Sequence, residues 1–225
     1  MTTLPSKGSA GPGTLPAEII EYGKKLVKSG LVTGTGGNIS VRVPGREAFL
    51  ITPSGIPYHE IEEQDLVLLD LEGNQLAGSR RPSIEQHLHC LIYRARPDVQ
   101  AVIHTHAVYT SAIAATRQDL PPILDTLVAA FGGGLKTASY ASIGTEELAQ
   151  NAVKALGKRN GVLLANHGAV CTGEDLAQAF SNAQLLEASA QTYIFAHLIG
   201  KPVILPPEVV EQEAQDLAQR YGQKK

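Results

Sequence analysis

Short segments rich in apolar and β-branched residues recur in the first third of the chain. Apolar and polar residues alternate through 39–43, a pattern typical of a strand with one buried face, whereas 48–51 and 66–71 are almost entirely apolar. The turn signal Glu72-Gly73-Asn74 predicts a hairpin between the third segment and the residues directly after the turn. Because short turns join these segments, we expect this part of the sheet to be antiparallel.

Longer segments carry apolar residues at helical spacing. We expect helices over 16–29, 83–96, 108–115, 145–156, 175–198 and 207–220, and a further element over 123–131. The helix over 83–96 opens on a capping box formed by Ser83 and Gln86, and Pro97 follows its end. Glu85 therefore falls in the first turn of that helix.

Two apolar segments end in histidines. The segment 99–103 leads into His104 and His106, whose side chains leave a strand on the same face, roughly 7 Å apart. The segment 161–170 has the same design and presents His167 at the end of an apolar strand. Three such histidines are what a catalytic zinc site with an open fourth position needs, although hydrogen-bonded histidines at strand ends would show the same pattern.

Other titratable residues near these segments have two interpretations each. Glu85 is either a carboxylate that complements the positive end of its helix or a general base beside a metal ion. His87 and His89 cannot share a helix face, because they are two residues apart. We expect them to be surface or packing histidines and not ligands.

Glycine-rich turns are candidates for holding an anion. Residues 33–38 include three glycines in five positions and precede the strand over 39–43, so they form either a phosphate nest or a simple turn. The segment lacks the Lys-Ser/Thr ending of a P-loop, and a strand follows it where a dinucleotide fingerprint would have a helix. The turn over 52–57 could provide a second phosphate wall.

Composition narrows the class of protein. The 225 residues fit one domain over 15–225, preceded by a disordered tail over 1–14 that lacks the apolar core of a signal peptide. With a net charge of −3 and no basic block except Lys224-Lys225, nothing favours a nucleic acid or a membrane surface as partner. Cys90 and Cys171 lack metal or redox spacing, which predicts buried thiols in a reduced, cytoplasmic protein.

Five motifs together resemble the class II aldolase and adducin-head family. In order, they are the Gly-rich run ending at Ser40, the segments 51–58 and 82–85, the strand with His104 and His106, and Asn166-His167-Gly168. The resemblance covers the chain from about Pro16 to its C-terminus. It implies an α/β fold in three α/β/α layers around a mixed, largely antiparallel sheet, a Zn²⁺ held by the three histidines, and a homotetramer with active sites at subunit contacts.

The resemblance also assigns further roles. It implies a phosphate pocket made by Gly37, Asn38, Ser54, Gly55 and Ser83. The chain departs from the pattern at Ile84, where a second serine is common; our own hypothesis is that Arg81 replaces the lost contact. Thr126 stands where the family has a proton-donating tyrosine, and Tyr221 matches a tail tyrosine that could act in catalysis by closing over the substrate.

The expected function follows from the chemistry of these groups. Neutral imidazole ligands leave a metal ion its full positive charge, and this charge stabilises an enediolate. We expect the enediolate to form when a ketose 1-phosphate similar to L-fuculose 1-phosphate is cleaved to dihydroxyacetone phosphate and a short aldehyde. Glu85 is placed to move the proton. Alternatives within the resemblance are a methylthioribulose-1-phosphate dehydratase, a pentulose-phosphate 4-epimerase, whose family members carry Asp at the position of Glu85, and a non-catalytic adducin-like scaffold, which lacks the histidines.

Overall fold

The structure is a computed structural model that describes the backbone of residues 14–220 and the side chains of residues 14–214. The expected tail up to residue 13 and Tyr221 therefore lie outside the described residues. The elements, in chain order, are α1 (Leu15–Lys28), β1 (Asn38–Arg42), β2 (Ala48–Ile51), the 3-10 turn η1 (Glu63–Asp65), β3 (Val67–Asp70), β4 (Gln75–Ala77), α2 (Gln86–Ala95), β5 (Ala101–Thr105), α3 (Val108–Thr116), α4 (Asp125–Phe131), β6 (Thr137–Ala138), α5 (Glu146–Leu156), β7 (Gly161–Leu164), β8 (Gly168–Gly173), α6 (Leu176–Ile199) and α7 (Pro207–Arg220).

The strands form one eight-stranded sheet in the order β4-β3-β2-β1-β5-β8-β7-β6. Within the described part of the chain, β6 and β7 pair in parallel and the other neighbours pair antiparallel. The expected mixed, largely antiparallel sheet and the β3–β4 hairpin are thus confirmed. The central position of β5 is decided by long-range pairing, because its neighbours β1 and β8 lie about sixty residues away on either side.

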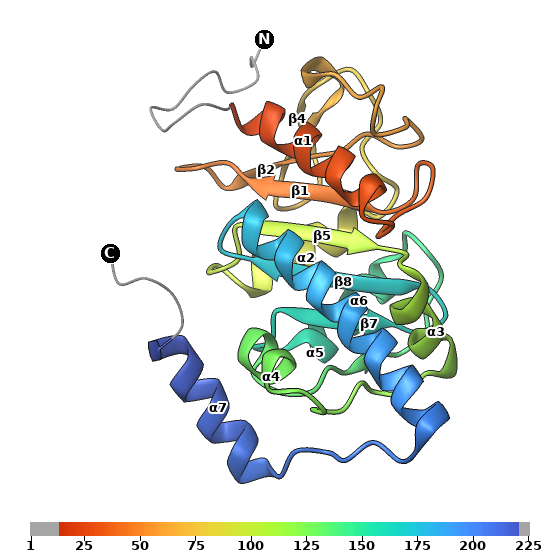
Figure 1. Cartoon of the computed structure of the whole chain (residues 1–225). Coiled ribbons are helices and arrows are strands. Elements are labelled where there is room, and N and C mark those ends of the chain that lie inside the picture. Colours follow the sequence, from red (N-terminus) through yellow and green to blue (C-terminus); the bar gives the residue numbers. More distant parts are fainter. Residues whose placement is uncertain (1–13, 221–225) are drawn as a thin grey trace.

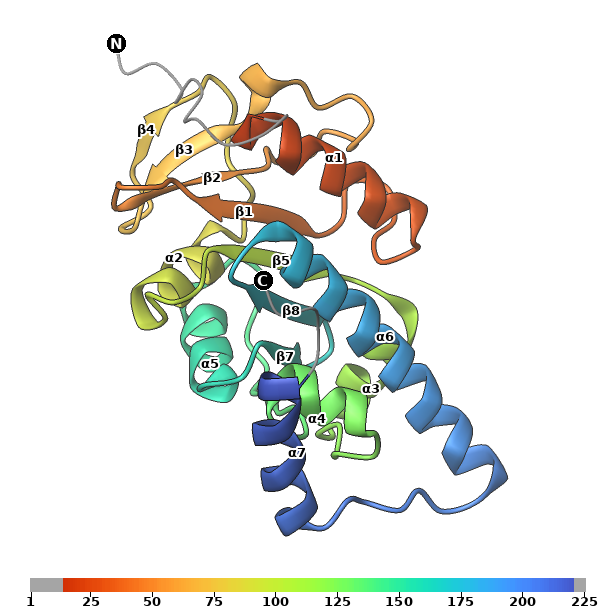
Figure 2. The same ribbon diagram turned by 60° about the vertical axis from the view of Figure 1, so that its left-hand side comes forward.

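Helices cover both faces of this sheet, which explains why β2 is apolar throughout. Ala48 and Leu50 pack in the core beneath α1, α3, α4 and α6, whereas Phe49 and Ile51 pack in the core beneath α2 and α5. Figure 1 shows α6 crossing one face diagonally, and Figure 2 shows α2 and α5 on the opposite side of the strands. The three-layer α/β/α fold expected from the sequence is confirmed.

The start of α2 differs from the expectation. The capping box at Ser83 was predicted to begin the helix there, but α2 begins at Gln86 and Glu85 occupies the N-cap position. The physical reason is that residues 82 and 83 are extended: Pro82 forms a bridge with Pro53, and the Ser83 N–H donates to the Thr52 carbonyl at 3.1 Å. This pairing with the 52–57 turn competes successfully with helix formation, so Glu85 precedes the first turn.

The segment 161–170 also differs from the single strand that its apolar run predicted. It forms the hairpin of β7 and β8, in which Leu164 pairs with Gly168 across a three-residue turn. Asn166 adopts a left-handed conformation in this turn, with φ of 56°. Asparagine is one of the few residues that tolerate that region, so a turn signal was present inside the apolar run.

Cys90 and Cys171 are free and buried, as predicted. In the part of the chain that the structure describes, none of the helices has the length and apolar character required to cross a bilayer.

Candidate functional site

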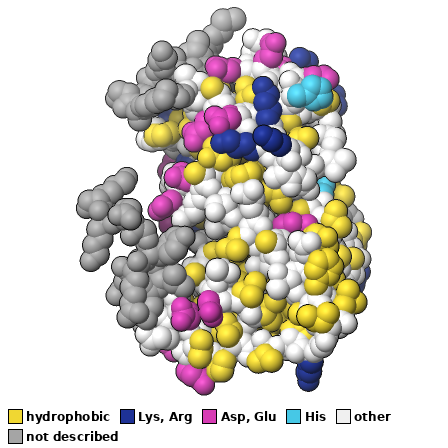
Figure 3. All heavy atoms as spheres, viewed as in Figure 1, with side chains coloured by type: hydrophobic (Ala, Val, Ile, Leu, Met, Phe, Trp, Pro, Cys, Tyr) yellow, Lys and Arg dark blue, Asp and Glu magenta, His cyan; other side chains and the backbone are white. Residues whose placement is uncertain are grey.

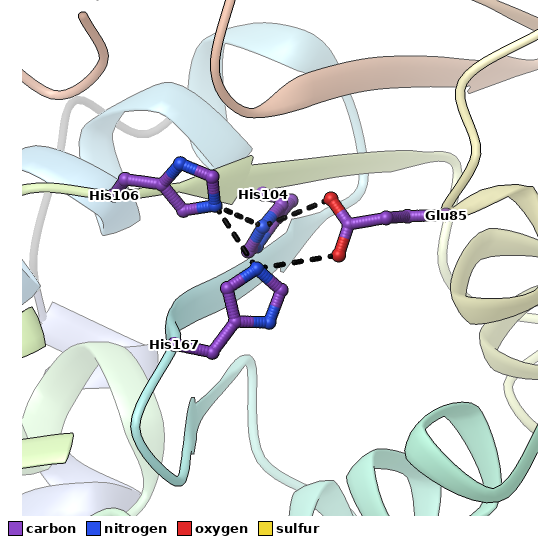
Figure 4. A group of neighbouring side chains, drawn as sticks. All are labelled: Glu85, His104, His106 and His167. Atoms are coloured by element: carbon purple, nitrogen blue, oxygen red, sulfur yellow. Dashed lines mark hydrogen bonds and ion pairs between the residues drawn. The ribbon is translucent and has the colours of Figure 1, made fainter. Parts of the chain in front are cut away.

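The register between β1 and β5 builds one wall of the site. Asn38 lies directly opposite His104, so both side chains leave the sheet on the face covered by α2. His106 follows two residues later, just beyond the end of β5, and its Nε2 lies 2.8 Å from that of His104. The strand pair predicted from the sequence therefore does meet at one point (Figure 4).

The β7–β8 hairpin brings the third histidine to the same point. The Nε2 atom of His167 lies 3.1 Å from that of His106. The close approach of this hairpin to β5 depends on Gly168, because a Cβ atom at that position would lie 2.2 Å from the Thr105 carbonyl oxygen. The hairpin turn thus places His167 on the same side of the sheet as His104 and His106.

Glu85 faces the three imidazoles from the N-cap of α2. Its Oε2 lies 3.2 Å from His104 Nε2, its Oε1 lies 3.4 Å from His167 Nε2, and the Asn38 amide nitrogen donates to Oε2 at 2.9 Å. One ligand atom from each of Glu85 and the three histidines lies within 4.8 Å of the others. The Figure 4 view shows the carboxylate opposite the imidazole edges.

Protonation of the histidines follows from their surroundings. His104 Nδ1 lies 2.9 Å from the Ala169 carbonyl oxygen, which can only accept, so Nδ1 carries the proton and the Nε2 of a neutral ring offers its lone pair. Burial lowers the pKa of His106 and of His167 to about 4. Burial raises the pKa of Glu85, whereas the hydrogen bond that the Asn38 amide donates to its carboxylate lowers it.

These groups fit a divalent metal ion. The Nε2 of His104 is a lone pair and lies 3.2 Å from the carboxylate oxygen Glu85 Oε2, so two groups that only accept face each other with no proton between them. Glu85 Oε1 is buried and has no hydrogen-bond partner among the described residues. A cation bound by the three Nε2 lone pairs and balanced by the carboxylate would satisfy this arrangement.

The residues expected to bind phosphate lie on three neighbouring segments. The Ser54 N–H donates to the Arg81 carbonyl at 3.0 Å, which places the 52–57 turn beside Ser83. Thr52 in the same turn exchanges hydrogen bonds with Ile39, which places the turn beside β1. Ser54 and Gly55 are exposed, whereas Ser83 is buried and its hydroxyl accepts the Glu85 N–H at 3.3 Å. The amide group of Asn38 is engaged with Glu85 and His89, so it faces the interior of the site.

The remaining residues singled out in the sequence differ in their surroundings. Arg81 is exposed beside the 52–57 turn, Thr126 is exposed in the first turn of α4, and Tyr221 is outside the described residues. His87 is half-buried on α2 and, like His89, is not part of the histidine cluster. His89 is completely buried, as a packing histidine would be, and it is also hydrogen-bonded to the polar side chains of Asn38 and Ser40, which was not predicted.

A cavity of about 790 Å³ lies away from these residues, between α7 and the loop over 132–134. Its lining is mainly apolar and contains none of the four cluster residues. The convergence of donor atoms, and not the size of this cavity, therefore marks the candidate site.

Three imidazoles and a carboxylate at the end of a central strand form a candidate metal site in a three-layer α/β fold. The chain belongs to the class II aldolase and adducin N-terminal domain family, whose model matches residues 17–194. The histidine and glutamate cluster and the similarity to aldolases identify it as a lyase.

Individual relatives agree with this placement. The 5-deoxy-D-ribulose 1-phosphate aldolase of Bacillus thuringiensis serovar kurstaki is 40% identical over 209 residues, which cover 92% of this chain and 96% of that protein. The L-fuculose phosphate aldolase of Escherichia coli K12 is 36% identical over 189 residues, covering 84% and 86% of the two chains. A solved structure described as L-fuculose 1-phosphate aldolase superimposes with a TM-score of 0.89 at 41% identity, covering 94% of this chain and all of that one.

Proposed function

We propose that this protein reversibly cleaves a ketose 1-phosphate to dihydroxyacetone phosphate and a short aldehyde. The observation that carries the proposal is the convergence of three imidazole nitrogens and the Glu85 carboxylate beside turns suited to a phosphate. The relatives' names support two kinds of substrate, L-fuculose 1-phosphate and 5-deoxyribulose 1-phosphate.

His104, His106 and His167 would hold one Zn²⁺ per subunit, since three neutral nitrogen ligands suit this ion, and other divalent metals bind the same ligands. When bound, the ion supplies Lewis-acid stabilisation of the negative charge that carbon–carbon cleavage leaves on the substrate oxygens. In the condensation direction the Glu85 carboxylate takes a proton from the carbon of dihydroxyacetone phosphate that attacks the aldehyde, and in cleavage the resulting carboxylic acid returns that proton to the same carbon. The three imidazoles suffice for metal binding, so the carboxylate is free for this role.

Gly37, Asn38, Ser54, Gly55 and Ser83 form the phosphate pocket in this proposal. Exposed backbone and hydroxyl groups of the 52–57 turn are its outer wall, and Ser83 joins it to Glu85. Tyr221 closes over the substrate and takes part in catalysis from the C-terminal segment. Thr126 occupies the position where the family has a tyrosine, and a threonine hydroxyl is much less acidic than that of tyrosine. We therefore assign the protonation of the aldehyde oxygen to another donor.

The experiment is a product assay on the zinc-loaded protein with L-fuculose, L-rhamnulose, D-ribulose, 5-deoxyribulose and methylthioribulose 1-phosphates. Release of dihydroxyacetone phosphate from at least one substrate is expected, and condensation of dihydroxyacetone phosphate with the matching aldehyde should regenerate it. An epimer or a dehydrated product without dihydroxyacetone phosphate would refute the aldolase and support the epimerase or dehydratase. A protein that binds no metal and converts none of the substrates would support the scaffold.

The oligomer and the compartment belong to the same proposal. Apolar side chains stand exposed at the C-terminal end of α6 and in the loop after it (Figure 3). Ile199 is 91% exposed. The exposed apolar side chains include Phe195, Leu198, Ile199, Val203 and Ile204. Such a patch supports a homotetramer, which native mass spectrometry tests, and the free buried thiols support a cytoplasmic location.

A further inference from the structure

A buried chain of hydrogen bonds runs from the candidate site into the core beneath α2. Asn38 bridges Glu85 and His89: its Nδ2 donates to Glu85 Oε2 at 2.9 Å, and its Oδ1 accepts from His89 Nε2. The chain continues from His89 Nδ1 to the Ser40 hydroxyl at 2.6 Å and from Ser40 to the Tyr93 hydroxyl at 2.8 Å. His89 and Ser40 are completely inaccessible to solvent, and Tyr93 is nearly so.

The direction of the hydrogen bonds in this network follows from its Glu85 end. An ionised carboxylate can only accept, so Glu85 must face the amide nitrogen of Asn38, and the amide oxygen then faces His89. An amide oxygen also only accepts, so His89 carries its proton on Nε2. In a neutral ring Nδ1 then accepts a hydrogen bond from the Ser40 hydroxyl. The Tyr93 hydroxyl, which also faces the Gln100 carbonyl at 3.5 Å, lies closer to Ser40, at 2.8 Å, and donates to it.

The reversed chain is unfavourable for a specific reason. If His89 carried its proton on Nδ1, its Nε2 lone pair would draw the Asn38 amide nitrogen toward itself. The amide oxygen would then lie against Glu85 Oε2, and two acceptors would face each other in a buried site where unpaired polar groups are costly. The position of one proton on His89 therefore decides whether Asn38 supports Glu85 or repels it.

We propose that His89 is a positioning residue for Glu85, because its Nε2–H holds the Asn38 amide in the orientation that donates to the carboxylate. This inference rests on the proposed function for the proton transfer at Glu85. His89 touches neither the three histidines of the cluster nor the substrate turns in this role; it acts through Asn38.

The first test reads the proton directly. ¹⁵N-histidine-labelled, zinc-loaded protein is examined by NMR, and the His89 signals are assigned by their loss in His89→Gln. We expect a protonated Nε2 and an unprotonated Nδ1 for His89. A protonated Nδ1 would overturn the inference, whatever the activity of the enzyme.

The second test is kinetic and uses the zinc-loaded enzyme with its best ketose 1-phosphate. His89→Phe removes both hydrogen bonds of the ring, and we expect kcat to fall on the order of 100-fold with little change in KM or zinc content, because the carboxylate loses its fixed position. His89→Gln should recover most of the loss, since its amide can donate to Asn38 and accept from Ser40. Ile92→Ala, which removes buried volume from the same helix, is the matched control and should retain wild-type kcat.

The outcomes separate the two proposals. Wild-type kcat in His89→Phe, or equal losses in His89→Phe and Ile92→Ala, would overturn the positioning role while leaving the aldolase in place. If wild-type protein cleaves none of the ketose phosphates, the proposed function fails, and the tautomer of His89 still tests the orientation of Asn38. If His89→Phe does not fold, the NMR measurement of the His89 tautomer in the wild-type protein tests the positioning role instead.

Discussion

The Glu187 carboxylate accepts the backbone N–H of Tyr109 at 2.8 Å. Its other oxygen accepts the N–H of Thr110 at 2.9 Å, so a side chain from the middle of α6 caps the N-terminus of α3. The residue at the N-cap of α3 is Ala107, which has no side chain able to do so. Since Ala107 follows His106, this long-range cap anchors the chain directly after a proposed metal ligand.

Glu187→Ala should destabilise the protein and weaken metal binding. Two charge-assisted hydrogen bonds are lost and two helix N–H groups are left without a partner, which costs roughly 1–3 kcal/mol. Thermal unfolding and zinc titration of the apoprotein measure the two effects. The control is Glu174→Ala, an exposed position just before α6; equal melting temperatures for the two variants would refute the capping role.

Gly37→Ala should cost far more stability than Gly34→Ala. Both glycines lie in the same loop with positive φ, 69° and 62°. A Cβ atom on Gly37 would lie 2.5 Å from the His104 carbonyl oxygen, whereas one on Gly34 meets nothing within 4 Å. We expect about 1–2 kcal/mol for the backbone conformation alone in Gly34→Ala, and a further loss of about 1–3 kcal/mol in Gly37→Ala with reduced zinc content, measured by denaturant unfolding and metal analysis. Similar losses in the two variants would contradict the close packing of this loop on β5.

Glu85→Gln should keep its zinc and lose turnover. The amide preserves the size of the side chain but cannot take or return a proton, so kcat should fall by about 100-fold or more while the three histidines still bind the metal. Zinc content by atomic absorption and steady-state kinetics provide the two measurements. Near wild-type turnover in a fully loaded variant would remove Glu85 from the proton transfer.

Removing one imidazole or the metal should abolish activity. His167→Ala leaves two histidine ligands, and we expect substoichiometric zinc and loss of turnover; treatment of wild type with a chelator should have the same effect, reversed by added Zn²⁺. His87→Ala is the matched control, because this half-buried histidine lies outside the cluster. Full activity in metal-free protein would exclude the proposed centre.

The alternation of side chains along strands allowed much of the site to be predicted. The spacing of His104 and His106 placed both on one strand face, and the apolar run before His167 indicated a histidine delivered from the sheet. The predicted bounds of β2 and α7 agree with the structure, because the first is bounded by turn residues and the second begins at a proline suited to the first turn of a helix.

Other features depended on contacts that no local pattern contains. The capping signal at Ser83 lost to pairing with Thr52, thirty residues earlier in the chain. His89 is completely buried, which agrees with the packing histidine named as one of the two alternatives, but its hydrogen bonds were not predicted. Its partners Asn38 and Ser40 come from a strand about fifty residues away, so helical spacing on α2 could not show that it is hydrogen-bonded.

Local chemistry was thus enough to specify which residues could serve: three imidazoles, one carboxylate and the glycines that permit tight turns. These side chains meet at one point only because of the antiparallel register of β1, β5 and β8. The pairing of β1 with β5 sets Asn38 opposite His104, and the pairing of β5 with β8 brings His167 to the same place. Periodicity along a strand or helix is a property of a few neighbouring residues, and it can be recognised one segment at a time. Register between distant strands is selected by burial of the whole core, so it exists only once the chain has folded.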